Sequence, residues 1–177
     1  KPSEITPRFM TPLMNVINNI PQLRDILTFV EGDGKTGAAL VDNVDLVCFT
    51  GSVETGQQIA IAAAERFIPA FLELGGKDPA IVLESADIEL ATSALLWGSV
   101  VNSGQSCLSI ERIYVHKNIY EDFYHQIVGK AHKVNLAYPT LESGEIGPII
   151  SEKQAAIINE HLKDAVEKGA VIHCGGE

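Results

Sequence analysis

Two side chains in this sequence have the types and settings of a covalent catalyst and its base. Cys107 ends the loop NSGQSC (102–107) after a largely apolar segment, and Glu73 lies in the apolar run LELGGK (72–77). A thiolate nucleophile needs a partly exposed loop with backbone N–H donors nearby. A carboxylate among apolar neighbours holds its proton more tightly, which suits a general base. Taken singly, each has a structural interpretation as the default: a small buried thiol, and a solvated carboxylate at a strand end.

The other thiols and the histidines suggest no second reactive set. Cys48 lies in an apolar run and is predicted to be core, while Cys174 is given no role. The three cysteines show no C-x-x-C spacing, which disfavours a disulfide framework or a zinc site and favours a reducing, cytoplasmic compartment. No metal is expected, because the histidines do not cluster at metal-ligand spacing; they stand at positions 116, 125, 132, 161 and 173.

Two glycine-rich turns could meet a phosphate. Residues 32–37 match G-x-G-x-x-G, but the acidic residue of the dinucleotide fingerprint does not follow, so a tight turn is an equal interpretation. Residues 51–56 join a strand to a helix, whose first N–H groups attract anions. Ser52 could donate a hydroxyl to such an anion or serve as an ordinary N-cap.

The elements that would position these residues alternate between strand and helix. This order predicts an α/β fold with parallel sheets flanked by helices. Helix caps are expected at Ser52, Asp87, Asn118 and Ser151, and Trp97 and Phe123 are expected in the core or an interface. Strands are predicted over 26–32, 44–51, 69–76, 78–85, 111–117 and 170–176, and helices over 8–19, 52–67, 87–103, 118–134 and 151–169, with a short one after 32.

The composition excludes some kinds of partner. The formal net charge of −10 argues against binding to nucleic acid or a membrane surface, which both require a basic face. The 46% content of hydrophobic residues is ordinary for a packed globular domain. No apolar run is long enough to predict a transmembrane helix.

Four motifs follow one another along the chain: KPSE, FTGS with Gly56, LELGGKDP and NSGQSC. With these motifs in this order, the whole chain resembles the aldehyde dehydrogenase superfamily. The resemblance implies that Cys107 is the nucleophile, forming a thiohemiacetal and then a thioester. It implies that Glu73, 34 residues earlier, activates the water that hydrolyses the thioester. The backbone N–H of Cys107 would supply half of the oxyanion hole.

The resemblance also implies a cofactor and a substrate site. NAD is favoured over NADP, because a carboxylate at Glu4 would bind ribose hydroxyls and repel a 2′-phosphate. The substrate, an uncharged aldehyde, would pass Val101, Ser106 and Leu108 beside the thiol. The implied cofactor contacts are Lys1 and Glu4 at the adenosine ribose, Gly34 near the adenine, Gly51 and Ser52 at the pyrophosphate, and the main chain of Leu74 near the nicotinamide.

In this family, residues 1–75 would be the C-terminal part of the Rossmann-like coenzyme-binding domain and 76–177 the N-terminal part of the catalytic domain. The active site would lie in the cleft between them. An oxyanion-hole Asn and a ribose-binding Glu are expected outside this stretch, so we expect an internal fragment that is inactive alone. The full-length protein would be a homodimer or homotetramer. The alternatives are a CoA-acylating or other semialdehyde dehydrogenase, or a catalytically inactive family member; Glu73 argues against the first, and Glu73 with Cys107 against the second.

Overall fold

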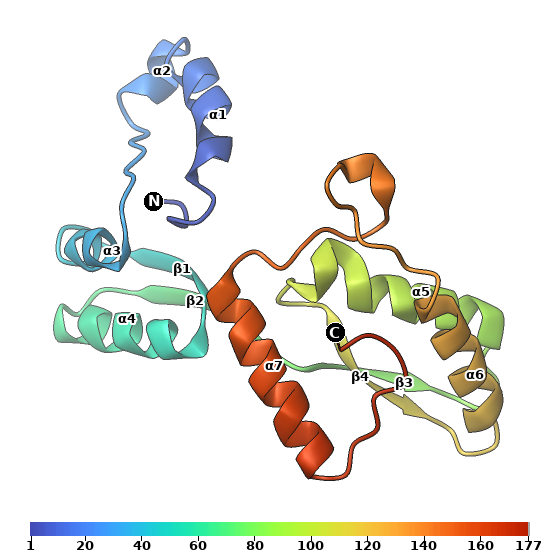
Figure 1. The fold of residues 1–177 in the computed structure, drawn as a ribbon. Coiled ribbons are helices and arrows are strands. Elements are labelled where there is room, and N and C mark those ends of the chain that lie inside the picture. The colour runs from blue at the N-terminus through green and yellow to red at the C-terminus, as the bar shows by residue number, and fades with distance from the viewer. Residues whose placement is uncertain (177) are drawn as a thin grey trace. The chain divides into compact units, whose positions relative to one another are not determined.

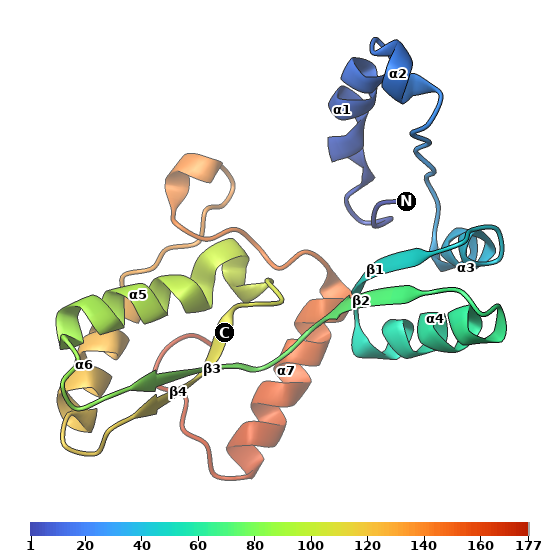
Figure 2. The same cartoon turned by 180° about the vertical axis from the view of Figure 1, so that it is seen from behind.

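The computed structural model describes residues 1–176, except for the side chain of residue 141, and it divides into two compact units (Figures 1 and 2). Unit 1 is Lys1–Gly75 and unit 2 is Gly76–Glu177. The elements of unit 1 are η1 (Pro7–Phe9), α1 (Met10–Ile17), α2 (Pro21–Arg24), α3 (Gly34–Val41), β1 (Val47–Gly51), α4 (Val53–Glu65) and β2 (Ala70–Leu74). Those of unit 2 are β3 (Asp78–Val82), α5 (Ile88–Val100), η2 (Val101–Gly104), β4 (Ile110–Val115), α6 (Tyr120–Ala131), η3 (Leu141–Ser143) and α7 (Glu152–Glu167).

Unit 1 contains two short parallel strands joined by a helix. β1 and β2 pair along their whole length, and α4 connects them. Gly56 of α4 lies close against β2, since a Cβ at this position would come within 2.6 Å of a Leu74 methyl group. Cys48 and its register partner Phe71 point to the other face and are exposed. The prediction of a core Cys48 is therefore wrong, because the helix covers one face of the strand pair only.

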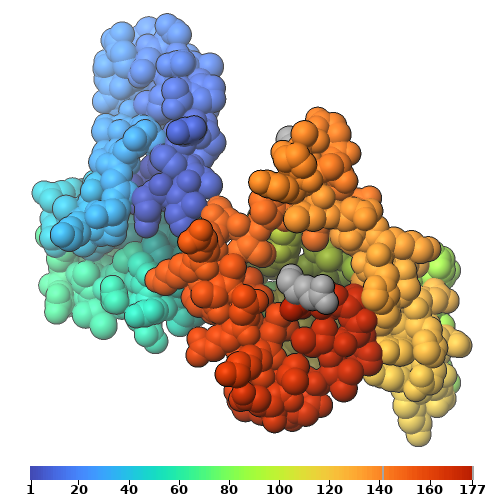
Figure 3. Space-filling model, viewed as in Figure 1, coloured from blue at the N-terminus to red at the C-terminus, as the bar shows by residue number. Residues whose placement is uncertain are grey.

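Unit 2 repeats the strand–helix–strand arrangement. β3 and β4 pair in parallel, and α5 connects them and packs against α6. Val82 and Phe123 are buried, as expected for Phe123, and Thr92 of α5 is fully buried. On the other face of the strand pair, Ile81 and its register partner Tyr114 are exposed. In Figure 3 the loop around η3, coloured orange, protrudes from the surface of this unit.

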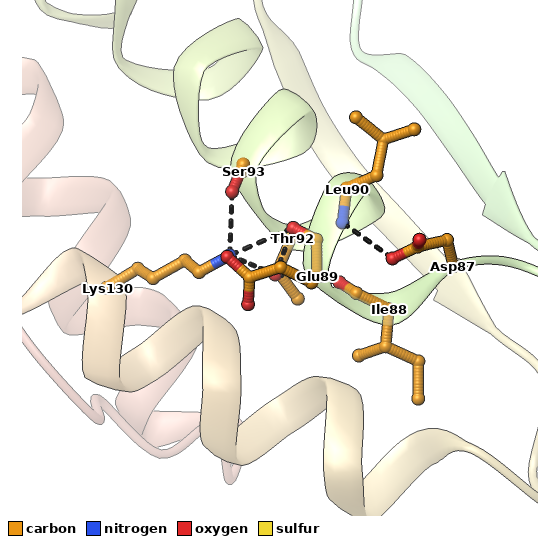
Figure 4. Close-up of polar contacts among 7 residues, drawn as sticks. All are labelled: Asp87, Ile88, Glu89, Leu90, Thr92, Ser93 and Lys130. Atoms are coloured by element: carbon orange, nitrogen blue, oxygen red, sulfur yellow. Dashed lines mark hydrogen bonds and ion pairs between the residues drawn. The ribbon is translucent and has the colours of Figure 1, made fainter.

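A lysine fixes α6 to the start of α5 (Figure 4). Lys130 of α6 donates to the main-chain oxygen and a carboxylate oxygen of Glu89, both at 2.9 Å. It also donates to the hydroxyls of Thr92 and Ser93, both at 2.7 Å. The lysine side chain is 23% exposed. The contacts thus hold the first turns of α5 against α6 from a partly buried position.

Three of the predicted helix caps are confirmed and one is wrong. Side chains of Ser52, Asp87 and Ser151 each accept a hydrogen bond from a first-turn N–H group of their helix. Asn118 does not cap α6, which begins after Ile119. The Asn118 side-chain amide instead donates to a carboxylate oxygen of Glu84, at 2.7 Å. Glu84 lies in the loop after β3.

Two predicted strands do not form. Residues 26–32 run from α2 to α3 without strand pairing among the described residues (Figure 1). Residues 170–176 also lack a strand: the Ala170 N–H closes the end of α7 by donating to Ala165, and Gly175 and Gly176 have φ values of +67° and +89°. A strand requires a partner for its N–H and C=O groups, and neither β-forming sequence has one in the described part of the chain.

Candidate functional site

Cys107 lies shortly after the end of α5, beyond one intervening turn. The helix ends at Val100, and Asn102, Ser103 and Gly104 then have φ values of +52°, +59° and +72°. Cys107 lies in the next turn, which the Ser109 N–H closes by donating to Ser106 O at 3.1 Å. The Cys107 thiol is exposed. The structure thus presents this sulfur to solvent rather than burying it in the core.

The residues flanking this thiol line an open groove of about 650 Å³ on unit 2. The groove is mainly apolar and runs along the last turns of α5 to the start of β4. All three predicted substrate residues border it, although their role stays a prediction. Its lining consists of Ala94, Trp97, Gly98, Val101, Asn102, Ser106, Leu108 and Ile110.

Trp97, which the sequence predicts in the core or an interface, lines this groove. Its side chain is 67% exposed. It precedes Val101 by four residues, so both side chains lie on one side of the end of α5. This spacing was the signal in the sequence that could have placed Trp97 beside Val101 in the groove.

Glu73 is the last residue but one of β2 in unit 1. Its register partner is Thr50 of β1, and both side chains point away from α4 and are exposed. The expectation of apolar surroundings is therefore wrong within this unit, because Glu73 alternates with Leu72 and Leu74, which take the half-buried positions. The Glu73 side chain is therefore open to solvent on this face of unit 1.

Several predicted cofactor residues meet at the carboxyl edge of the β1–β2 pair, where ligands bind in open α/β sheets. Gly51 and Leu74 are register partners at the ends of their strands. Ser52 caps α4, accepting from Thr55 N at 3.2 Å and donating to Thr55 Oγ1 at 3.0 Å. Its hydroxyl is thus used as an N-cap. The N–H groups of the first two helical residues have no partner inside the helix and could meet an anion.

Lys1 and Glu4 form an ion pair of 3.3 Å. The stem of Lys1 approaches α3, with its Cδ 4.0 Å from where a Cβ of Gly37 would be. The pKa of Glu4 is lowered first by a hydrogen bond that its carboxylate accepts from the Glu4 backbone N–H. The hydrogen bond from the Lys1 ammonium and the positive charge of that group lower it further. Glu4 is therefore a carboxylate at neutral pH, able to accept hydrogen bonds from hydroxyl groups.

The start of α3 is an unfavourable place for a phosphate. Asp33 caps this helix, accepting hydrogen bonds from Lys35 N at 2.9 Å and Thr36 N at 3.4 Å. The carboxylate already occupies the donors that a pyrophosphate would need. Gly34 leaves open space at this end, because no atom lies within 4 Å of where its Cβ would be. The G-x-G-x-x-G run therefore serves as a capped turn.

No set of three or more His, Cys, Asp or Glu side chains in residues 1–176 is arranged to hold a metal ion. Within the same range, no helix has the length and apolar character needed to span a membrane.

Comparison with known proteins gives consistent matches. The sequence model of the Aldehyde dehydrogenase family matches residues 1–177. The solved structure of PutA from Anabaena variabilis, assigned to the aldehyde dehydrogenases, has 69% identity and a TM-score of 0.96, covering 99% of this chain and 38% of that one. Betaine aldehyde dehydrogenase from Staphylococcus aureus, solved with NAD+, has 33% identity and a TM-score of 0.94, covering 99% and 35%.

A curated relative extends the comparison. Betaine aldehyde dehydrogenase from Brucella ovis is 36% identical over 178 residues, which covers 99% of this chain and 37% of the relative. The chain spans 32% to 37% of the length of the curated relatives it matches. The parallel strand pairs and flanking helices described above are thus one part of a larger α/β fold in these proteins.

Proposed function

The chain belongs to the aldehyde dehydrogenase family, and we propose that its full-length protein oxidises an aldehyde to a carboxylic acid with NAD as the hydride acceptor. One observation carries the proposal within this family. The exposed Cys107 thiol stands on a turn whose neighbours, Ser106 and Leu108, line an apolar groove. This arrangement supports a nucleophile at Cys107 beside a binding surface for an uncharged aldehyde in unit 2.

The proposed chemistry begins at the sulfur. Cys107 Sγ bonds to the aldehyde carbon, and the carbonyl electron pair moves onto oxygen, toward which the Cys107 backbone N–H donates. NAD, when bound, would supply the two-electron acceptor for the hydride of this carbon, and the acyl group would stay on Cys107 as a thioester. Glu73 accepts a proton from the water that attacks the acyl carbon. The C–S bond then breaks, which releases the carboxylic acid and restores the thiolate.

The residues of unit 1 fit the chemical groups of NAD. The carboxylate of Glu4 and the ammonium of Lys1 are paired and suited to ribose hydroxyls. The start of α4, after Gly51 and Ser52, offers unpaired N–H groups to a pyrophosphate. We propose that these residues, with Gly34 at the adenine and the Leu74 main chain at the nicotinamide, hold the cofactor.

Substitution of each proposed catalytic residue in the full-length protein tests this function. Cys107→Ser should abolish both the first turnover and steady-state oxidation, because the alcohol is a far weaker nucleophile. Glu73→Gln should keep a burst of NADH equal to the enzyme concentration but lower steady-state turnover by about 10²-fold or more, since only hydrolysis needs the base. Rapid-mixing absorbance measurements of NADH separate the two phases.

The matched control is Cys48→Ser, which removes another exposed thiol. It should leave both phases unchanged. Full turnover by Cys107→Ser would disprove the covalent route. Unchanged acid production by Glu73→Gln would instead show that the thioester passes to CoA or phosphate, or that another base acts.

We further propose a cytoplasmic setting and a homodimeric or homotetrameric full-length protein. The three free cysteines suit a reducing compartment. Mass photometry of the full-length protein would test the oligomeric state, and a monomer at micromolar concentration would contradict it.

A further inference from the structure

The backbone before Cys107 is held in a conformation that the chain does not adopt freely. Asn102 and Ser103, neither of them glycine, have positive φ values of +52° and +59°, and Gly104 continues the series at +72°. Side chains with a Cβ rarely populate this region, and such residues persist only where their surroundings over-determine them. The contacts that hold this turn therefore also affect the position of the thiol that follows it.

The carboxamide of Gln105 makes three of these contacts. Its Nε2 donates to Asn102 O at 3.2 Å, inside the turn, and to Pro148 O at 3.4 Å, outside it. Its Oε1 accepts from the N–H of Ile150 at 2.7 Å. Partner types fix the orientation of the amide, because carbonyls must face the NH₂ group and an N–H must face the oxygen. Only a side chain with both donors and an acceptor can make this set.

A second side chain joins the turn to the same segment. Ser103 Oγ donates to Gly147 O at 2.7 Å. The segment 147–150 is itself anchored, because it leads into Ser151, whose hydroxyl caps α7 by accepting from Gln154 N at 3.2 Å. The strained turn is thus bound to a segment about 45 residues away in sequence, at the start of a 16-residue helix.

We propose that Gln105 is a positioning residue for the reaction of Cys107: its carboxamide locks the turn 102–105 onto segment 147–150 and so sets the place of the thiol beside the groove. The inference rests on the proposed function of Cys107. Gln105 acts through the backbone and does not touch the reacting atoms. Loss of the lock lets the turn relax toward ordinary φ values and displaces the sulfur.

The test compares variants of the full-length protein. Gln105→Met keeps the length of the side chain but removes all three hydrogen bonds, and Gln105→Glu keeps the acceptor for Ile150 and removes both donors. Displacement of a nucleophile by about 1 Å can cost on the order of 10²-fold in rate. We therefore expect the NADH burst rate and kcat to fall by about 10²-fold, with a much smaller change in KM for the aldehyde, because Ala94, Trp97 and Ile110 of the groove lie outside the turn.

A second readout needs no substrate. Alkylation by iodoacetamide, followed by peptide mass spectrometry, gives the rate at Cys107 relative to Cys48, an exposed thiol of unit 1. A general loss of structure changes the alkylation rates of both thiols, whereas a displaced turn changes the Cys107 rate alone. The matched control is Gln154→Met, an exposed position on α7, which should resemble the wild type in both readouts.

A drop in kcat together with a changed Cys107-to-Cys48 ratio would support the positioning role. A wild-type value in either readout would overturn it. If Gln105→Met does not fold, Gln105→Glu decides by the same two measurements. The proposed function fails separately, through turnover by Cys107→Ser, so the two failures can be told apart.

Discussion

Ser109 carries a buried hydroxyl two residues after the proposed nucleophile. It is 1% exposed, and its Oγ has no hydrogen-bond partner among the described residues. Desolvating a hydroxyl without giving it a partner costs about 1–3 kcal/mol. At the scale of a single residue, this position is therefore one where the side chain lowers the stability of the fold.

We predict that Ser109→Ala raises the free energy of unfolding by about 1 kcal/mol, because it removes the unpaired hydroxyl without leaving a large cavity. Urea titration of the full-length protein measures the change. Ser99→Ala is the matched control: Ser99 Oγ donates to Leu95 O at 2.8 Å, so its removal should be neutral or destabilising. Equal effects at both positions would contradict the explanation.

At the scale of elements, α5 and α6 are joined by the Lys130 contacts. The ammonium has its three protons directed to four oxygens of Glu89, Thr92 and Ser93 in the first turns of α5 (Figure 4). Because α5 leads into the turn 101–104 that precedes Cys107, the contacts fix the opposite end of the helix that leads to the site. The partial burial of Lys130 makes these charge-assisted bonds stronger than surface ion pairs.

Lys130→Met should lower the free energy of unfolding by about 2 kcal/mol, since it removes hydrogen bonds to a charged group and keeps the apolar stem. Lys168→Met is the control, because the Lys168–Asp164 pair on α7 has a lysine that is 73% exposed. That change should stay within about 0.5 kcal/mol. Chemical denaturation of both variants gives the comparison, and a control as destabilised as Lys130→Met would refute the assignment.

Features that depend on neighbouring residues could be predicted from the sequence, whereas contacts between residues far apart in the chain could not. Ser52, Asp87 and Ser151 cap helices that begin next to them, so each could be identified from a few neighbouring residues. Asn118 was misassigned because its partner, Glu84, is 34 residues away. The sequence also showed Cys107 in a loop, but it could not show that Gln105 binds residues 148 and 150, since that contact depends on how the chain folds back.

At the scale of the whole molecule, the two units each expose one face of a strand pair. Phe71 is 60% exposed in unit 1, and Ile81 and Tyr114 are 74% and 54% exposed in unit 2. Exposed apolar side chains on an uncovered sheet face are typical of surfaces that pack against other protein. The assignment of the units to coenzyme-binding and catalytic domains stays a prediction.

We predict that the 177-residue chain, expressed by itself, associates with itself and binds the dye ANS, because these faces have no cover within their units. Light scattering after size-exclusion chromatography measures the mass. Phe71→Thr combined with Ile81→Thr should reduce both signals, whereas Glu160→Gln, an exposed polar position on α7, should not. A monomeric, dye-free chain would contradict this prediction.

The bond between Ile150 N–H and Gln105 Oε1 has an experimental use. The sulfur of Cys107 gives no convenient magnetic resonance signal, but the Ile150 amide proton does. Its rate of exchange with solvent deuterium and its chemical shift should follow the closing and opening of the turn before the thiol. One backbone amide can therefore serve as a probe of the turn, from a segment that is distant in the chain and takes no part in the proposed chemistry.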